Sequence, residues 1–345
     1  MDSKGKKILV TGGTGYIGSH TVVELLNENY EVVIIDNLSN SDQGVLDGIK
    51  EITGIKPEFY QLDLCDREAL VDFFAGNRDI DSVIHFAAYK AVGESTKKPL
   101  KYYRNNLVST MNLLECMIDH QVTNIVFSSS CTIYGQPDQL PVDESASVKD
   151  PLSPYGNTKQ TNERMIQYTV EAGNPVKGIS LRYFNPIGAH PSAKIGEIPQ
   201  GIPNNLVPYI TQTAIGIREE LKVFGNDYNT PDGTPIRDYI NVVDLAKAHV
   251  VAIARLIKNK NKNGYEYFNL GTGRGYTVLE VINAFEKATG QKLNYKIVDR
   301  RPGDVEKVYA DTSYANKELG WKAEKTLEET LKSAWEFEKT YRARN

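Results

Sequence analysis

Residues 11–18 read TGGTGYIG and come directly after a short apolar run, Ile8–Val10. Gly12, Gly15 and Gly18 recur at three-residue spacing. Glycine is needed where a strand-to-helix turn is tight and where the backbone must approach a phosphate closely. A helix that begins here directs its first N–H groups at an anion. Because a plain turn also tolerates glycines, the surrounding sequence has to distinguish the two interpretations.

The second apolar run ends at Asp36, 18 residues after Gly18. A carboxylate at this spacing can accept hydrogen bonds from an adenosine ribose and repels a 2′-phosphate, so the pattern predicts NAD rather than NADP. Asp63 follows the third apolar run. It is interpreted either as an adenine contact or as a turn-capping residue, and the sequence leaves both open.

Short β-branched runs alternate with helical patterns over the first 130 residues, and a sixth run follows the helix after Tyr155. The helical patterns cover Tyr16–Asn27 and Lys101–His120. The apolar runs are typical of buried parallel strands: Ile8–Val10, Val32–Ile35, Phe59–Leu62, Val83–Phe86, Ile125–Phe127 and Gly178–Leu181. We therefore expect an α/β fold, a Rossmann-type doubly wound parallel sheet with helices on both faces.

The pattern changes after Tyr183, where prolines, glycines and asparagines become frequent. This composition indicates longer loops that cover a substrate. We expect a smaller, interleaved α/β substrate domain over about 184–237 and 269–345, with residues 1–183 and about 238–268 in the dinucleotide domain. The second glycine cluster, 270–275, is expected to be a joint to a helix with Thr277 as its N-cap.

Composition excludes several classes of protein. The chain has 345 residues, of which 40% are hydrophobic and 24% charged, with a net charge of -4. These values are those of a globular protein and argue against a nucleic-acid binder. The sequence contains no run of about 18 apolar residues, so no membrane span is predicted. The three cysteines are too few and too scattered to predict disulfides, which favours the cytoplasm. No His/Asp/Glu cluster has the spacing of metal ligands, so no metal site is predicted.

Candidate catalytic residues follow the fifth run and open the next helix. Ser130 lies at the end of the run, and Tyr155 and Lys159 are four residues apart, on one helix face. A free tyrosine has a pKa of about 10 and is a poor base. An ammonium ion within about 4–6 Å lowers such a pKa by roughly 1–3 units. A phenolate could then take a proton from an alcohol while the cofactor takes the hydride, with Ser130 bonded to the same oxygen.

Taken together, these motifs resemble the extended short-chain dehydrogenase/reductase family, and within it the epimerases of UDP-hexoses. The resemblance covers nearly the whole chain. It rests on TGGTGYIG, on FAAYKAVGES at 86–95, on SSSCTIYG at 128–135, on YGNTK at 155–159, on LRYFN at 181–185, on NNL at 204–206 and on RDYI at 237–240. It implies NAD as cofactor, a UDP-hexose substrate inverted at C4 through a 4-keto sugar, and a homodimer.

The resemblance also implies roles for individual residues. Tyr155 would be the base, Lys159 its partner and Ser130 an assistant at the sugar 4-hydroxyl. The implied cofactor contacts are Gly12, Gly15, Tyr16, Ile17, Gly18, Asp36, Asn37, Asp63, Leu64, Phe86, Lys90, Asn105, Tyr155, Lys159 and Tyr183. The implied substrate contacts are Lys90, Ser130, Tyr155, Asn185, Asn205, Leu206, Arg237, Arg301, Asp304 and Val308.

Val308 is expected to set the width of the sugar pocket. It is the seventh residue after Arg301, where a large ring in the family implies restriction to UDP-galactose and UDP-glucose. Valine is smaller, so we expect N-acetylated UDP-hexosamines to be accepted less well than UDP-glucose. A one-residue shift in this assignment would instead place the ring of the adjacent Tyr309 in the pocket, and the sequence leaves both registers open.

Two other functions compete with this interpretation. A nucleotide-sugar 4,6-dehydratase would need Thr-Asp-Glu after the fifth strand, where this chain has Ser130-Cys131-Thr132. A non-enzymatic NAD sensor would not need Tyr155 with Lys159. The apolar residues of the 101–120 helix could face a second subunit or the chain's own sheet.

Overall fold

A computed structural model describes residues 5–301 and 304–344. Within these residues the chain divides into two compact units. Unit 1 comprises residues up to Gly135, Val148–Arg182 and Ala246–Phe268. Unit 2 comprises Gln136–Ser147, Tyr183–Leu245 and the residues from Asn269 onward.

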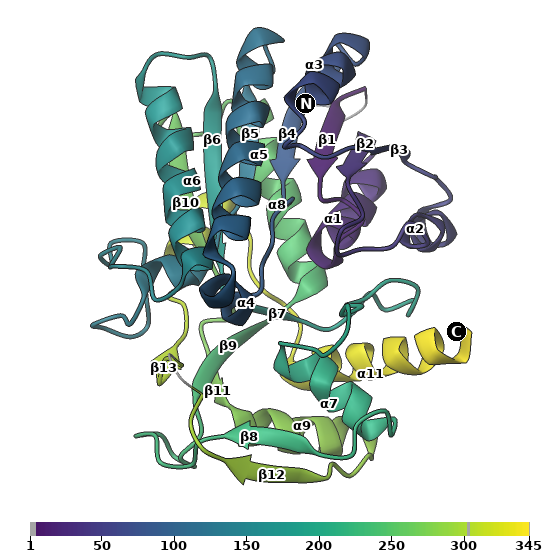
Figure 1. Ribbon diagram of the computed structural model, residues 1–345, viewed down its shortest axis with the longest axis vertical. Helices are drawn as coiled ribbons and strands as arrows, with labels where there is room; N and C mark the ends of the chain where they lie inside the picture. Colours follow the sequence, from purple (N-terminus) through teal and green to yellow (C-terminus); the bar gives the residue numbers. More distant parts are fainter. Residues whose placement is uncertain (1–4, 302–303, 345) are drawn as a thin grey trace. The chain divides into compact units, whose positions relative to one another are not determined.

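Unit 1 alternates strands and helices along the chain, as the apolar runs predict (Figure 1). Its elements, including three that continue into unit 2, are β1 (Lys7–Thr11), α1 (Tyr16–Asn27), β2 (Glu31–Asp36), α2 (Val45–Thr53), β3 (Glu58–Gln61), α3 (Arg67–Gly76), β4 (Ile80–His85), α4 (Val92–Lys97), α5 (Pro99–Asp119), β5 (Asn124–Ser128), the 3₁₀ helix η1 (Cys131–Tyr134), α6 (Pro154–Glu171), β6 (Lys177–Tyr183), α8 (Val242–Ile257) and β10 (Tyr265–Leu270).

Seven strands form one sheet in the order β10-β6-β5-β4-β1-β2-β3. All neighbours from β6 to β3 pair in parallel. The carboxyl ends of these strands therefore share one edge, where open α/β sheets bind their ligands. The order reverses between β1 and β4, because β2 and β3 extend the sheet on one side of β1 and the later strands extend it on the other.

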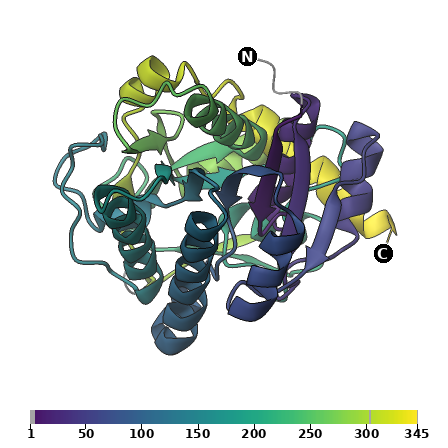
Figure 2. The same cartoon turned by 90° about the horizontal axis from the view of Figure 1, so that it is seen from above.

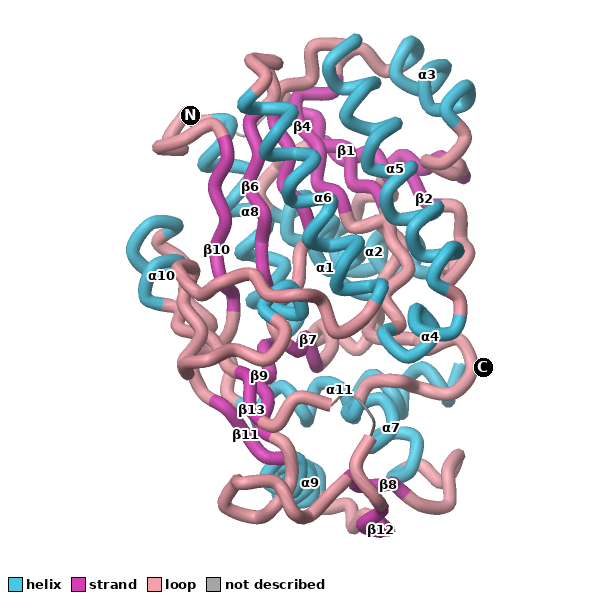
Figure 3. Tube along the Cα trace, turned by 60° about the vertical axis from the view of Figure 1, so that its left-hand side comes forward, coloured by secondary structure: helices cyan, strands magenta, loops and turns pink. Residues whose placement is uncertain are grey.

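Two layers of helices cover this sheet (Figures 2 and 3). On one face α5 and α6 lie side by side with α3 beside α5, and α1 and α8 lie on the other face. Leu9, Phe127 and Ile166 belong to the core of the first face, whereas Ile8 and Val10 alternate to the second. The expected doubly wound α/β fold is confirmed. One expectation is wrong: β3 is not buried, because it is the edge strand.

Unit 2 contains shorter elements. They are β7 (Asn185–Ile187), α7 (Leu206–Ala214), β8 (Leu221–Phe224), β9 (Ile236–Asn241), β11 (Gly275–Thr277), α9 (Val278–Thr289), β12 (Tyr295–Val298), β13 (Lys307–Val308), α10 (Ser313–Leu319) and α11 (Leu327–Arg344). Strand β9 pairs with β7, β11 and β13, and β8 pairs with β12. The core of the unit joins α7, α9 and α11 through apolar side chains that include Ile210, Phe285 and Trp335.

The second glycine cluster surrounds a buried carboxylate rather than a phosphate. Asp238 is fully buried on β9 and accepts hydrogen bonds from Thr272 N at 2.9 Å, Gly273 N at 3.2 Å and Ala310 N at 3.2 Å. Burial raises the pKa of Asp238, and these donors oppose the shift. Thr277 caps α9 in a capping box with Glu280, as predicted.

The boundaries between the units differ from the expected ones. Residues 238–245 lie in unit 2 rather than with the dinucleotide domain, because β9 makes its ladders with β7, β11 and β13. Residues 136–147 also lie in unit 2, because Val142 N donates to Tyr309 O at 2.9 Å and Asp311 N donates to Val142 O at 2.7 Å. Such long-range ladders leave no local signal in the sequence. Across residues 5–301 and 304–344, no helix is both long and apolar enough to span a membrane.

Gly12→Ala tests the turn after β1. Gly12 has φ +72°, and an added Cβ would lie 2.7 Å from Ala87 N. Both the backbone strain and the clash oppose a side chain, so we expect the free energy of unfolding to fall by about 1–3 kcal/mol. Chemical denaturation measures it. In the control Gly76→Ala, an added Cβ meets nothing within 4 Å, and equal destabilisation of both variants would contradict the account.

Candidate active site

The glycine loop fits a diphosphate. Gly12 N donates to Ile35 O at 2.7 Å, which ties the loop to β2. The N-cap of α1, Gly15, makes no side-chain capping bond, so no side chain blocks the first turn of the helix. An added Cβ on Gly18 would collide with the Gly12 carbonyl, so the loop and the helix pack backbone to backbone. A helix N-terminus of this kind binds anions.

Asp36 joins the glycine loop to the turn after β2. Its carboxylate accepts hydrogen bonds from Thr14 N at 3.3 Å, Leu38 N at 2.9 Å and Ser41 Oγ at 3.2 Å. Two carboxylate oxygens offer about four acceptor sites, so a ribose hydroxyl can still be bound. The residues present therefore fit the adenosine end of NAD.

The ends of β2 and β3 bring Asn37 and Asp63 together. Asn37 Nδ2 donates to Asp63 Oδ2 at 3.1 Å, and Cys65 N donates to Asp63 Oδ1 at 2.8 Å. Asp63 thus has the turn-capping role that the sequence left open, and its adenine contact stays a prediction. Leu64 beside it is buried.

The segment after β4 lies beside the glycine loop. Phe86 N donates to Thr11 O at 2.9 Å, and the Phe86 ring packs against His249 of α8 at 4.7 Å. Lys90 Nζ lies 5.7 Å from the centroid of the Tyr16 ring, at the start of α1. The predicted contacts Phe86, Lys90 and Tyr16 are therefore neighbours at the end of β1.

Asn106 is a buried residue of this site that the sequence analysis missed. Its Oδ1 accepts from Tyr89 N and from Asn105 Nδ2, each at 2.9 Å, and its Nδ2 donates to Tyr89 O and to Thr158 Oγ1, each at 3.1 Å. One amide thus connects the Lys90 segment, Asn105 of α5 and the helix of Tyr155. The one signal for Asn106 in the sequence is that it follows Asn105, a predicted cofactor contact.

Ser130 is presented by a tight turn at the carboxyl end of β5. As N-cap of η1, its Oγ accepts from Thr132 N at 3.2 Å and from Thr132 Oγ1 at 3.0 Å. Both lone pairs are engaged, so its own proton can be donated to a substrate oxygen. The first turn of α6 lies against the same turn, because an added Cβ on Gly156 would be 3.4 Å from Thr132 O.

Tyr155 and Lys159 project from one face of α6, whose N-cap Ser153 and Pro154 match the prediction. Lys159 Nζ donates to Ser128 O at 2.5 Å and lies 5.9 Å from the centroid of the Tyr155 ring. Burial lowers the pKa of Lys159 to about 7, and the negative charge of Glu163 opposes this shift. The structure therefore brings a buried ammonium to the base predicted from sequence.

His85 lies between β1 and α5. Its ring nitrogens hydrogen-bond Thr11 Oγ1 at 2.7 Å and Thr110 Oγ1 at 3.1 Å. Burial, and secondarily the charge of Lys159, lower the pKa of His85 to about 3. It is a neutral core histidine, and no group of three or more His, Cys, Asp or Glu residues able to hold a metal occurs in the described parts of the chain.

In unit 2, three predicted substrate residues share one face of the β9 sheet. Val308 pairs with Arg237, and Asn185 pairs with Tyr239, both in parallel register. Paired residues and residues two apart point to the same face. Asn185, Arg237 and Val308 therefore lie on one face, and Arg237 Nη2 also donates to Asp304 Oδ1.

The remaining predicted residues of unit 2 lie on separate elements. Asn205 is the N-cap of α7 and donates from Nδ2 to Glu197 Oε1 at 2.8 Å, with Leu206 next to it. The Arg301 guanidinium lies 5.2 Å from the centroid of the Phe224 ring. Tyr183 ends β6 and is buried.

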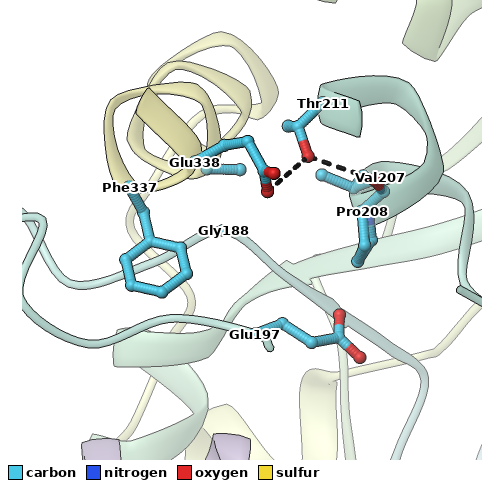
Figure 4. Close-up of a pocket in the computed structure, with 8 residues that line it drawn as sticks. Gly188, Glu197, Val207, Pro208, Thr211, Phe337 and Glu338 are labelled. Carbon is cyan, nitrogen blue, oxygen red and sulfur yellow. Dashed lines mark hydrogen bonds between the residues drawn. The ribbon is translucent and has the colours of Figure 1, made fainter. Parts of the chain in front are cut away.

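A small pocket lies in unit 2 beside α7 and α11 (Figure 4). Thr211 Oγ1 donates to Glu338 Oε2 at 3.3 Å at its wall, and the pocket volume is about 10 Å³. This is room for about one water molecule and not for a sugar. Its lining consists of Gly188, Glu197, Val207, Pro208, Thr211, Ala334, Phe337 and Glu338.

Comparisons with known proteins agree with this geometry. Residues 9–334 match the family model described as GDP-mannose 4,6 dehydratase. A UDP-glucose 4-epimerase of Bacillus subtilis (strain 168) is 53% identical over 331 residues, which cover 96% of each chain. One from Homo sapiens is 51% identical over 340 residues, covering 97% of each.

Solved structures of UDP-glucose 4-epimerases are also similar to this chain. The UDP-glucose 4-epimerase of Bifidobacterium longum, in complex with NAD+ and UDP, is 47% identical with a TM-score of 0.93, and the match covers 98% of this chain and 99% of that one. The matching region contains TGGTGYIG, Ser130, Tyr155 and Lys159 together with the UDP-binding positions predicted in unit 2. This chain is therefore a member of the UDP-glucose 4-epimerase family of extended short-chain dehydrogenase/reductases.

Proposed function

We propose that this chain interconverts UDP-galactose and UDP-glucose by NAD-dependent inversion at C4 of the hexose. The observation that carries the proposal is the buried Lys159 ammonium, bonded to Ser128 O and facing Tyr155 on the same helix face. A protein that only sensed NAD would have no use for a base beside an alcohol-binding serine. The match to 4-epimerases over nearly the full chain supports the same activity.

In the proposed mechanism, Tyr155 removes the proton of the sugar 4-hydroxyl and Ser130 donates a hydrogen bond to the same oxygen. Lys159 stabilises the phenolate form of Tyr155 by its charge. NAD, when bound, supplies a reversible hydride acceptor at C4. Arg237 and Arg301 hold the diphosphate while the 4-keto sugar rotates about its link to the diphosphate and presents its other face. Tyr155 then returns the proton to the sugar oxygen.

The fit of the cofactor rests on this chain's own groups. The glycine loop and the uncapped start of α1 suit the diphosphate, and Asp36 suits the adenosine ribose. Because the hydride returns to the sugar, NAD is not consumed. The direct test is a coupled assay for UDP-glucose formed from UDP-galactose without added NAD. Turnover supports the proposal, and its absence from protein loaded with NAD refutes it.

A 4,6-dehydratase is the nearest competing reaction, because the matching family model carries that description. Elimination of water needs acids where this chain has Cys131 and Thr132 after Ser130. We therefore expect no loss of water from the substrate. We also propose a cytoplasmic location, which rests on the three scattered cysteines of the sequence.

Tyr155→Phe should remove most turnover and leave the fold intact. The phenyl ring keeps the packing but cannot accept a proton, and a general base contributes about 10²–10⁴-fold. The coupled assay measures kcat. Tyr295→Phe is the control, because Tyr295 is 42% exposed on β12, belongs to neither the predicted site nor the proposed interface, and should keep full activity. Near-normal turnover by Tyr155→Phe would exclude the proposed role.

The width of the sugar pocket depends on which residue of β13 faces the sugar. Val308 shares the sheet face of Arg237, whereas an added Cβ on Gly275 would lie 3.1 Å from the Tyr309 ring. Gly275 pairs with Asp238, so the Tyr309 ring rests on the opposite face. This register supports Val308 as the residue near the sugar C2 substituent, and we propose on this basis that N-acetylated substrates are also accepted.

Val308→Tyr should abolish turnover of UDP-N-acetylglucosamine and spare UDP-glucose. A ring at this position would occupy the space of the N-acetyl group. The measurement compares kcat/KM for both sugars in wild type and variant. We expect wild type to use both, with UDP-glucose preferred. Failure of wild type to use the N-acetylated pair, or its use by Val308→Tyr, would contradict the assignment.

We also propose that two copies pair through α5 and α6. These helices lie side by side on the outside of unit 1 (Figure 3), and they expose Leu100 by 81%, Met111 by 42% and Tyr168 by 57%. Leu114 of α5 instead faces the chain's own core. Large apolar side chains exposed on neighbouring helices support a subunit interface there.

Met111→Glu should convert a dimer to a monomer at micromolar concentration, because the variant would bury a charge in the interface. Light scattering measures the mass. Ile55→Glu is the matched control, since Ile55 is 51% exposed at the end of α2 and should not change the mass. A monomeric wild type would refute the proposed dimer.

A further inference from the structure

Glu163 lies one helical turn beyond Lys159 on the same face of α6. Tyr155, Lys159 and Glu163 are spaced by four residues, and Glu163 is only 6% exposed. Burying a carboxylate is costly unless it is paired and hydrogen-bonded. A buried acid beside the catalytic pair therefore needs an explanation that the proposed chemistry alone does not supply.

The Glu163 carboxylate is held by two segments. Its Oε1 accepts from Ser129 Oγ at 2.5 Å and from Arg182 Nε at 3.0 Å, and its Oε2 accepts from Arg182 Nη2 at 2.7 Å. The forked guanidinium fixes the plane of the carboxylate. Both oxygens are therefore oriented by groups outside α6.

Arg182 is itself immobilised. Its Nη1 donates to Tyr134 OH at 2.9 Å, and its guanidinium lies 3.9 Å from the centroid of the Tyr267 ring. Burial disfavours the charge of Arg182, but bonding to Glu163 outweighs burial and raises its pKa. Arg182 is thus a cation held against the Glu163 carboxylate.

Ser129 connects this pair to the reacting groups. It lies between Ser128, whose carbonyl accepts the Lys159 ammonium, and Ser130, which caps η1. Ser129 N donates to Leu181 O of β6 at 3.0 Å. The serine segment is therefore fixed twice, by its backbone bond to β6 and by the Ser129 side-chain bond to Glu163. The carboxylate therefore touches the serine segment on one side and Arg182 on the other.

We propose that Glu163 is a positioning residue, whose carboxylate fixes the Ser128–Ser130 segment and supplies the negative charge that keeps Lys159 an ammonium in its buried site. The proposal rests on the proposed epimerase function. Glu163 would then be the third functional residue on this face of α6, four residues after Lys159.

The other ionisable groups around Lys159 do not supply this charge. His85 of β4 is neutral because burial lowers its pKa to about 3. Tyr265 of β10 is kept neutral, since burial raises its pKa well above the ordinary value. Arg182 of β6 is a cation, and Tyr155 is the group to be activated. Among these neighbours Glu163 is the anion that acts against the burial of Lys159.

The test is the pH dependence of kcat in holoenzyme. In Glu163→Gln the side chain keeps its shape but loses its charge, so the Lys159 ammonium is lost at lower pH. We expect the alkaline limb of the profile to move down by about one pH unit or more. Glu163→Asp keeps the charge and should keep the limb near the wild-type position, whatever its effect on stability.

Glu266→Gln is the matched control. Glu266 is buried and paired with Arg255 Nε at 2.8 Å, also in unit 1, but it contacts neither Lys159 nor Ser129 in its hydrogen bonds. It should lower the unfolding temperature as Glu163→Gln does and leave the pH profile unchanged. If Glu163→Gln does not fold, the double variant Glu163→Gln/Arg182→Met is compared with Arg182→Met, so that the two proteins differ only in the Glu163 charge; the double variant should have the lower alkaline limb.

An alkaline limb that stays in place in the folded Gln variant, or one that moves equally in Glu266→Gln or Glu163→Asp, would overturn the proposal. Failure of the proposed function is distinct, because wild type would then show no epimerisation at any pH. An active wild type with an unchanged Gln profile refutes the role of Glu163 alone.

Discussion

The hydrogen bond from Lys159 Nζ to Ser128 O, 2.5 Å long, is the interaction on which the rest of the catalytic unit depends. An ammonium buried to 3% exposure survives only if fixed dipoles and charges replace its water. The carbonyl at the end of β5 is one such dipole, and the Glu163 carboxylate is the charge. Burial still lowers the pKa of Lys159 to about 7. The site thus holds a cation that is close to losing its proton, beside the phenol that it activates.

The scaffold serves this arrangement by joining elements that are distant in the sequence. Parallel pairing brings the carboxyl ends of β1, β2, β4 and β5 to one edge of the sheet, where the glycine loop, Asp36 and Ser130 all follow strand ends. The helices are fastened by buried amides rather than by apolar contact alone. Asn106 bonds to Thr158, and Asn162 Nδ2 donates to Asn106 O at 2.9 Å, so α6 cannot slide along α5 without breaking both bonds. Buried hydrogen bonds of this kind favour one relative position of the two helices.

Much of this arrangement could be predicted from the sequence, because it depends on local signals. TGGTGYIG, the apolar run before it and the spacing to Asp36 predict a strand, a turn and a helix, and all three are present. Ser153 and Pro154 predict the start of α6 and hence the shared face of Tyr155 and Lys159. Long-range pairings could not be predicted in this way. Each of these pairings joins segments more than 15 residues apart in the chain. They are the β9 ladders that take residues 238–245 into unit 2, the bond of Asp238 to Thr272, the bond of Asn106 to Thr158 and the bond of Glu163 to Arg182.

Lys159 is a buried cation whose pKa lies at about 7, and NMR of holoenzyme with ¹³C-labelled lysine side chains can measure that pKa. A pH titration follows each lysine by the shift of its ε-carbon. We expect one lysine to titrate near pH 7, far below the ordinary value of 10.5, and its signal to be missing from the spectrum of Lys159→Met. A spectrum in which every lysine, including the one removed by that substitution, stays charged up to about pH 10 would contradict it.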